Sequence, residues 1–121
     1  MEKSDVTWKV FGVYMLILLL MIWAGTAKAQ MQLVVFNASW NDGNDVREWA
    51  FGMEDIQTYM YVDIGNDTEL QKKHKIAVIP TIIIFKEDEE VARFQADLSF
   101  KMVATKEEVQ EEINNQLMSD F

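Results

Sequence analysis

The residues best placed for chemistry form a short polar segment that follows an apolar stretch. Residues 33–36 are all hydrophobic, and after three further residues Trp40 precedes Asn41, Asp42, Gly43 and Asn44. A strand that ends in such a turn can present a nucleophile or a redox group. The segment offers amides and one carboxylate instead, and the chain contains no cysteine at all. Chemistry by a thiol of this chain is therefore excluded.

A second segment, Ile-Pro-Thr at residues 79–81, lies downstream. Together the two segments resemble the thioredoxin family, in which a Trp precedes Cys-x-x-Cys at the start of a helix and a cis-proline faces the cysteine pair. Trp40 and Pro80 match this pattern, whereas Asn41 and Asn44 stand at the cysteine positions. The resemblance implies the family's fold without its thiols.

A further departure from the family pattern agrees with this interpretation. Many thioredoxins carry a buried Asp in the strand before the motif, and the matching position here is Val35. Thiol–disulfide exchange requires one thiolate to attack and a second thiol to resolve the mixed disulfide. An ionised carboxylate that is buried without a functional role destabilises the folded state by on the order of several kcal/mol. Its absence therefore fits a chain that no longer carries out the reaction. We therefore predict a member that has lost redox function and is not an enzyme.

The resemblance also implies a contact face for a protein or an extended peptide. In working members the main chain beside the cis-proline pairs with an extended substrate and the Trp packs along it, and such pairing needs no thiol. The alternative is that the proline only fixes a tight turn, because X-Pro turns are structural by default. The predicted face comprises Trp40, Asn41, Asp42, Gly43, Asn44, Ile79, Pro80 and Thr81.

Other candidate groups have ordinary structural explanations. His74, the single histidine, is expected near the end of a helix, where a cation is favourable. Asp42 and Asp45, with Asn41 and Asn44, could bind a metal ion, but Asn and Asp also favour turns and helix caps. No cysteine or second histidine completes a ligand set. We expect no metal and no cofactor.

Charge narrows the range of partners. The formal net charge of the 121-residue chain is -9 at pH 7. This acidity argues against nucleic acid and anionic lipid surfaces, and favours solubility or a basic partner. The length is that of one domain.

The first 29 residues differ in composition from the rest. The apolar run 10–24 would span roughly 22 Å as a helix, which is shorter than the roughly 30 Å hydrocarbon core of a bilayer. Ala27 and Ala29 form the small-x-small pattern of a signal-peptidase site, with cleavage after Ala29. The alternative is an uncleaved membrane anchor formed by residues 8–24. Both forms predict export to a periplasmic or other extracytoplasmic location.

Hydrophobic periodicity predicts seven elements after this segment. The expected order is strand, helix, strand, helix, strand, strand, helix, with strands at 32–37, 58–64, 82–85 and 91–95 and helices at 45–53, 66–75 and from 106 onward. This is the order of a minimal thioredoxin fold, an α/β structure with a mixed four-stranded sheet flanked by helices. The resemblance covers about residues 31–118. We assign 1–29 to a signal or anchor helix and 30–121 to the thioredoxin-like domain.

The family usually has Gly in the turn before the last strand and another Gly after that strand. Residues 87–89 are instead Glu, Asp and Glu, and neither glycine is present. These departures predict a charged turn and a locally remodelled sheet edge.

Two functional hypotheses follow. The first is an exported, redox-inactive module that binds or scaffolds proteins through the Trp40 and Pro80 face. The second is a membrane-anchored structural subunit of a larger envelope or virion assembly, with the N-terminal segment as its anchor. An enzyme without a thiol is disfavoured, because no nucleophile–base pair or phosphate loop is visible in the sequence.

Overall fold

The structure is a computed structural model, and it describes residues 30–119. The predicted signal peptide or anchor at 1–29, including its apolar part at 8–24 and cleavage after Ala29, lies outside the described residues. Within residues 30–119 no helix is both long and apolar enough to cross a membrane.

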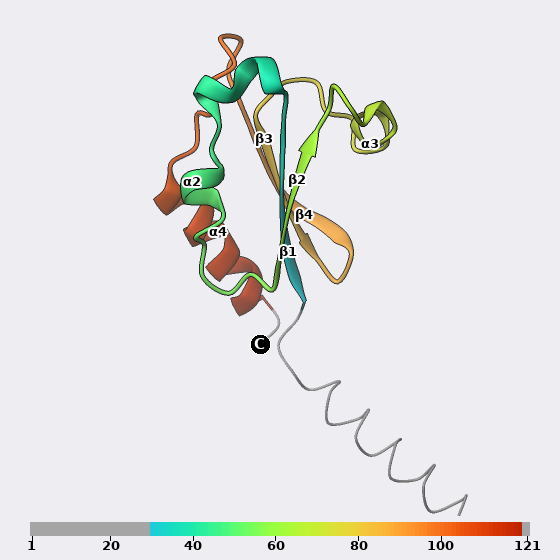
Figure 1. Ribbon diagram of the computed structural model, residues 1–121. Helices are drawn as coiled ribbons and strands as arrows, with labels where there is room; N and C mark the ends of the chain where they lie inside the picture. The colour runs from blue at the N-terminus through green and yellow to red at the C-terminus, as the bar shows by residue number, and fades with distance from the viewer. Residues whose placement is uncertain (1–29, 120–121) are drawn as a thin grey trace, which may run out of the picture.

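The centre of the fold is a mixed four-stranded sheet (Figure 1). Its strands are β1 (Met31–Asn37), β2 (Thr58–Asp63), β3 (Thr81–Lys86) and β4 (Glu89–Gln95). The order across the sheet is β2-β1-β3-β4, and β1 runs parallel to β2 and antiparallel to β3. β4 runs antiparallel to β3. The strands are rich in β-branched and aromatic residues, which suit a pleated surface, and the predicted mixed sheet is confirmed.

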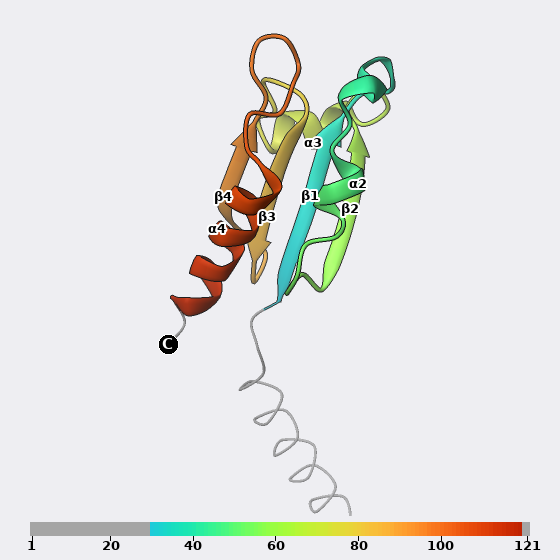
Figure 2. The ribbon, with the colours of Figure 1, turned by 90° about the vertical axis from the view of Figure 1, so that its left-hand side faces the viewer.

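Helices cover both faces of this sheet (Figure 2). The α-helices α2 (Arg47–Ala50) and α4 (Lys106–Met118) pack on one face, and α3 (Thr68–Lys73) lies on the other. A 3-10 helix, η1 (Ser39–Asn44), forms at the end of the sheet where β1 stops. The predicted order of strands and helices is therefore confirmed.

Two apolar cores lie on the two sides of the sheet. Because alternate side chains of a strand point to opposite faces, Leu33 and Val35 enter one core, whereas Val34 and Phe36 enter the other. The core under α2 and α4 consists of Met31, Leu33, Val35, Val46, Ala50, Met53, Ile82, Ile84, Val109 and Ile113. The core on the side of α3 consists of Val34, Phe36, Ala38, Val62, Ile76, Ile79 and Ile83. Burial on both faces explains why β1 and β3 read as continuous apolar runs.

The helix caps show how local sequence sets the helix starts. Thr105 accepts a hydrogen bond from the main-chain N–H of Glu108 at 3.2 Å, which is the N-cap bond of the predicted capping box. Its hydroxyl also donates to the Glu108 carboxylate at 3.2 Å. At α3 the cap is Asp67, whose side chain accepts from the N–H of Leu70 at 3.0 Å. The helix begins at Thr68, two residues later than predicted.

The helix predicted at 45–53 is much shorter than expected, since α2 spans only Arg47–Ala50. Asp45 has an extended main chain with φ -62° and ψ 141°, and its side chain accepts from the N–H of Arg47 at 3.0 Å. This local hydrogen bond competes with helix formation. The main chain therefore turns into the helix only at Arg47.

The turn between β3 and β4 is charged, as predicted, and contains no glycine. Glu87 and Asp88 both adopt left-handed backbone conformations, with φ 52° and 66°, which glycine or asparagine would adopt with less strain. Glu87 donates its main-chain N–H to the carbonyl of Gln30 at 3.0 Å, and its carboxylate accepts from the N–H of Gln30 at 3.0 Å. These contacts hold the turn against the start of β1.

Candidate functional site

Three asparagine side chains form a hydrogen-bonded chain where β1 ends. Asn41 donates its Nδ2 to Oδ1 of Asn37 at 3.1 Å, and Asn37 donates its Nδ2 to the main-chain oxygen of Asn41 at 3.4 Å. Asn44 donates its Nδ2 to Oδ1 of Asn41 at 2.9 Å. Asn37 is fully buried and Asn41 nearly so. The two positions that resemble the family's cysteines are thus joined by an amide–amide hydrogen bond.

Asn41 also ties this end of the sheet to a distant segment. Its Nδ2 donates to the main-chain oxygen of Phe100 at 3.2 Å. The Phe100 ring meets the Trp40 ring edge-on, with centroids 5.1 Å apart and planes at 89°, an arrangement that aromatic pairs favour. Phe100 has a left-handed φ of 65°, which is uncommon for a bulky side chain. The structure therefore holds Phe100 against Trp40 at some cost in backbone strain.

The loop that carries Phe100 joins β4 to α4 and is closed on itself. Ala96 and Met102 form an isolated antiparallel bridge. Between them, Oδ1 of Asp97 accepts from the Ser99 hydroxyl at 2.6 Å and from the N–H groups of Ser99 and Lys101 at 2.8 and 3.2 Å. These hydrogen bonds, the hydroxyl of Ser99 first, lower the pKa of the Asp97 carboxyl below its ordinary value. The loop is pre-organised by its own side chains.

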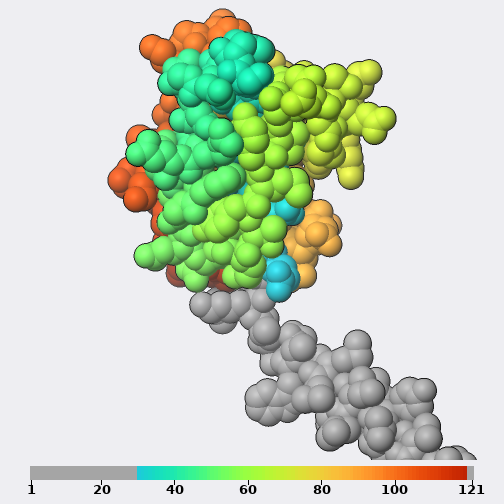
Figure 3. All heavy atoms as spheres, viewed as in Figure 1, coloured from blue at the N-terminus to red at the C-terminus, as the bar shows by residue number. Residues whose placement is uncertain are grey.

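Three large apolar side chains are exposed at this end of the molecule. Trp40 is 67% exposed, Phe100 is 41% exposed, and Leu98, two residues before Phe100 in the same loop, is 92% exposed. We call Trp40, Leu98 and Phe100 the tip patch. In Figure 3 atoms of η1 and of the β4–α4 loop lie together at this end of the surface. Exposed aromatic residues held in an ordered position are typical of contact sites between proteins.

The other half of the predicted face is internal. Ile79 is 3% exposed, and Pro80 and Thr81 are fully buried. The Ile79–Pro80 peptide bond is cis. The carbonyl of Pro80 accepts from the N–H of Ala96 at 3.1 Å, and that of Val78 accepts from the Thr81 hydroxyl at 2.7 Å. Both carbonyls are therefore used within the fold. The segment lies at the same end of the sheet as Trp40, because β1 and β3 are antiparallel.

The remaining predicted residues are accessible. Asp42 and Gly43 are exposed and Asn44 is half-buried. Asp45 has the cap-like role expected for it and forms an ion pair with Arg47 at 2.6 Å. The hydrogen bond with Asp45 raises the pKa of the Arg47 guanidinium, which also lies 3.8 Å from the centre of the Tyr61 ring. Within residues 30–119 no group of three potential ligands could hold a metal ion.

His74 caps the C-terminal end of α3, close to where the sequence placed it. Its ring packs between Phe36 and Phe85, with centroids 5.6 and 5.4 Å away. Burial lowers its pKa, and the charge of Lys73 lowers it further. Burial and the neighbouring Lys73 therefore disfavour the charged imidazolium that was expected at this helix end.

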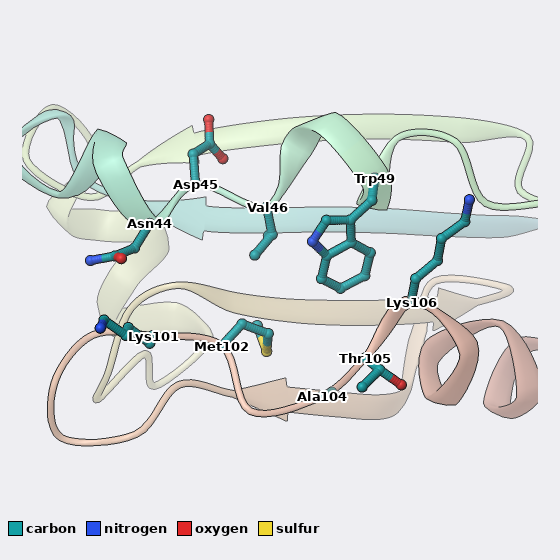
Figure 4. Close-up of a pocket in the computed structure, with 9 residues that line it drawn as sticks. All are labelled: Asn44, Asp45, Val46, Trp49, Lys101, Met102, Ala104, Thr105 and Lys106. Atoms are coloured by element: carbon teal, nitrogen blue, oxygen red, sulfur yellow. The ribbon is translucent and has the colours of Figure 1, made fainter.

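A shallow hollow of about 520 Å³ opens beside the tip, between α2 and the segment that leads into α4 (Figure 4). Val46 and Trp49 form one side, and Met102 and Ala104 form the other. Lys101 lies at one end of the hollow, near Asn44. The hollow extends the accessible surface next to the tip patch.

Solved structures with a similar fold include several thioredoxins. A mutant thioredoxin from Halobacterium salinarum gives a TM-score of 0.58 at 14% identity, with 73% of this chain and 75% of that chain covered. Thioredoxin-2 of a malaria parasite gives 0.53 at 18% identity, covering 74% and 86%. The oxidised thioredoxin of Plasmodium falciparum gives 0.51 at 17%, covering 73% and 82%. No protein-family model and no curated protein matches the sequence.

The chain thus has a thioredoxin-like fold, and the resemblance predicted from its sequence is confirmed at the level of the fold. It contains no cysteine, which is consistent with a redox-inactive form of this fold. At identities below one fifth the likeness defines architecture alone.

Sequence reasoning missed three residues of the site: Asn37, Leu98 and Phe100. Asn37 ends the apolar run 33–36 of β1, and a buried polar residue in such a position requires a hydrogen-bond partner. Leu98 and Phe100 are large apolar residues that alternate with polar ones in the segment Asp97–Lys101 of the connection. Nothing in the sequence shows that this connection folds back onto Trp40.

Proposed function

We propose that this protein is a redox-inactive binding or scaffold module whose contact surface is the tip patch. The observation that carries the proposal is the ordered exposure of Trp40, Leu98 and Phe100 on a scaffold without thiols. Rigid aromatic side chains gain much contact area on binding and lose little conformational entropy. The partner is a protein with an apolar recess that accepts the Trp40 and Leu98 side chains.

The contact differs in mechanism from the one predicted by resemblance. Beside Pro80, the carbonyls of Pro80 and Val78 each accept a hydrogen bond within the fold and the side chains of residues 79–81 are buried, so the exposed side chains of the tip patch are the more accessible contact. The proposed contact is made by side chains of the tip patch, with the exposed residues Asp42 and Gly43 at its rim.

The direction of β1 places the tip patch far from Gln30, the first described residue. β1 begins at Met31, directly after the first described residue, and runs toward η1. Gln30 and the tip patch therefore lie at opposite ends of the sheet. The patch stays available whether segment 1–29 is removed on export or kept as an anchor, and an anchored form would present it away from the membrane.

Site-specific photo-crosslinking tests this proposal. A photoreactive amino acid at Leu98 in the full chain, expressed in its native cells, should crosslink to a discrete partner. The matched control is Met118, which is 70% exposed and is the last residue of α4, the helix whose C-terminal end lies away from η1 in Figure 1. Trp40→Ala should reduce the Leu98 crosslink severalfold. Equal crosslinking at both positions would contradict the proposal.

Stability and redox measurements complete the test. Trp40→Ala should change the free energy of unfolding by less than about 1 kcal/mol, because the side chain is mostly exposed and loses one aromatic contact. Urea denaturation measures this effect and separates lost binding from lost folding. The purified chain should not accelerate the reduction of insulin by dithiothreitol. Measurable acceleration would refute the redox-inactive assignment.

A further inference from the structure

Within residues 30–119, strand β2 forms one edge of the sheet and pairs only with β1. The sheet order places β2 and β4 at the two edges. Figures 1 and 3 look directly onto the β2 edge, and Figure 3 shows its atoms at the surface. Edge strands offer unpaired main-chain groups to other chains, and proteins usually protect them with charges, proline or bulges.

The two edges differ in this protection. β4 carries Glu89, Glu90 and Arg93, and its pairing with β3 shifts register between Ile84 and Phe85. In β2, Thr-Tyr-Met-Tyr-Val-Asp, the only charged side chain is Asp63 at its end. β2 pairs with β1 in one unbroken register from Thr58 to Asp63, so no bulge interrupts it. The β2 edge is therefore the one suited to adding a strand.

The hydrogen bonds of the neighbouring strand show which groups of β2 face outward. Ile64, just after the strand, donates its N–H to the carbonyl of Asn37 at 2.9 Å. Successive residues of a strand direct their main-chain groups to opposite sides. Met60 and Val62 therefore pair with β1, whereas Tyr59 and Tyr61 direct their N–H and C=O groups away from the sheet.

We propose that this edge binds a second copy of the chain, with the two β2 strands antiparallel across a two-fold axis. Tyr59 of each copy would pair with Tyr61 of the other. In this register Asp63 comes only at the outer end, opposite Gln57, and no main-chain hydrogen bond is needed between them. The Asp63 carbonyl already accepts from Asn66 and Asp67 at 3.0 Å each, and the Gln57 N–H already donates to the Met31 carbonyl at 2.9 Å. A register centred on Tyr61 is less favourable, because it would pair Asp63 with Tyr59 in the inner part of the interface. The resulting sheet would have eight strands.

The side chains suit this register. Met60 is 44% exposed, and the two Met60 side chains would lie directly opposite each other and exclude water. The aromatic rings of Tyr59 and Tyr61 would form cross-strand pairs, which stabilise sheets. Asp63 would face Gln57, so the antiparallel arrangement keeps the two carboxylates at opposite ends of the interface. A parallel arrangement would bring them together, at a cost in repulsion.

The absence of cysteine allows a direct test. In the proposed register the Met60 positions form a pair without direct hydrogen bonds, with Cα atoms about 4.5 Å apart, within disulfide range. Met60→Cys in the full chain should therefore give a covalent dimer on mild oxidation. Gln95→Cys, exposed on the β4 edge, is the matched control and should give at least tenfold less.

Sedimentation of the full chain without cysteine measures the reversible dimer. Met60→Lys would place two like charges opposite each other and should raise the dimer dissociation constant at least tenfold, whereas Gln95→Lys should not change it. Trp40→Ala should leave the dimer intact, because the proposed interface excludes the tip patch, so this inference can fail independently of the proposed function. A chain that stays monomeric up to about 1 mM, or equal crosslinking at both cysteine positions, would overturn it.

Discussion

At the scale of single residues, Asn41 has the most connected side chain of the site. It joins Asn37 in the interior, Asn44 at the end of η1 and Phe100 in the β4–α4 loop. Where the family pattern has two thiols, this chain has an amide pair with a hydrogen bond of 2.9 Å. These amides fix the position of the tip patch without any redox chemistry.

Removing the Asn41 amide should be costly. Asn41→Ala leaves the buried Oδ1 of Asn37 without its donor and frees the Phe100 carbonyl. We expect the free energy of unfolding to fall by about 1–3 kcal/mol, measured by urea denaturation. Asn44→Ala, at a half-buried position with one of these bonds, is the control and should cost less. Equal losses for the two variants would show that the network is not centred on Asn41.

His74 is the second residue that gives a testable prediction, which concerns the dependence of the free energy of unfolding on pH. Its pKa is lowered by burial between Phe36 and Phe85 and by the charges of Lys73 and Arg93, with Glu90 acting in the opposite direction. The unfolded chain therefore binds a proton more readily than the folded chain. Stability is complete above the ordinary pKa and decreases as the pH falls through it.

The free energy of unfolding should thus decrease as the pH falls below about 6.5, the ordinary pKa of histidine. His74→Gln removes the titrating group and should flatten the profile between pH 7 and 5.5. The pKa of Glu90 is lowered by its hydrogen bond with Arg93, so its contribution is lost only at more acidic pH. A wild-type profile that is flat in this window would contradict the expected burial of His74.

At the scale of elements, the β4–α4 loop contributes Leu98 and Phe100 to the candidate contact surface at the end of the sheet. Its bridge between Ala96 and Met102 and its Asp97 hydrogen bonds hold Leu98 outward. Phe100 then meets Trp40 of η1. Two elements distant in sequence therefore present one patch.

Asp97 should control the order of this loop. Asp97→Ala removes the acceptor of the Ser99 and Lys101 N–H groups, so their hydrogen exchange should accelerate at least tenfold. Asp97→Asn keeps an acceptor oxygen and should retain most of the protection. In the wild-type chain the hydrogen bonds that lower the pKa of Asp97 stabilise the loop while the carboxylate is ionised. Their contribution is lost as the pH falls through that lowered pKa. Unchanged exchange in Asp97→Ala would show that the loop is held by other contacts.

At the scale of the whole molecule, the two ends of β1 differ in what lies beside them. The tip patch lies at one end of β1, and Gln30 lies at the other, where its N–H donates to the Glu87 carboxylate. Cleavage after Ala29 would convert this N–H into an ammonium group beside that carboxylate. The geometry at Gln30 is thus compatible with a processed N-terminus.

We therefore expect the chain, expressed with its native N-terminus in an exporting host, to have an intact mass that begins at Gln30. The soluble and membrane fractions should be measured separately. A membrane-bound product that retains residues 1–29 would instead favour the anchored structural subunit and would contradict the prediction of cleavage.

The sequence by itself determined the architecture. The apolar runs of β1 and β3, the capping box at Thr105 and the match at Trp40 and Pro80 each specify local structure, and together they define the fold. The missing cysteines are visible in the sequence and exclude thiol chemistry. These features are predictable because they depend on residue type, local hydrogen bonds and the periodicity of burial.

Only the tertiary structure decided which predicted residues are accessible. It buries Ile79, Pro80 and Thr81, because β4 and its following loop pack against the start of β3. It also brings Phe100 to Trp40 through the side chain of Asn41. Such contacts join residues far apart in the chain and depend on how loops close over a sheet, which no local pattern encodes. The composition of the candidate site therefore follows from packing, whereas its scaffold follows from sequence.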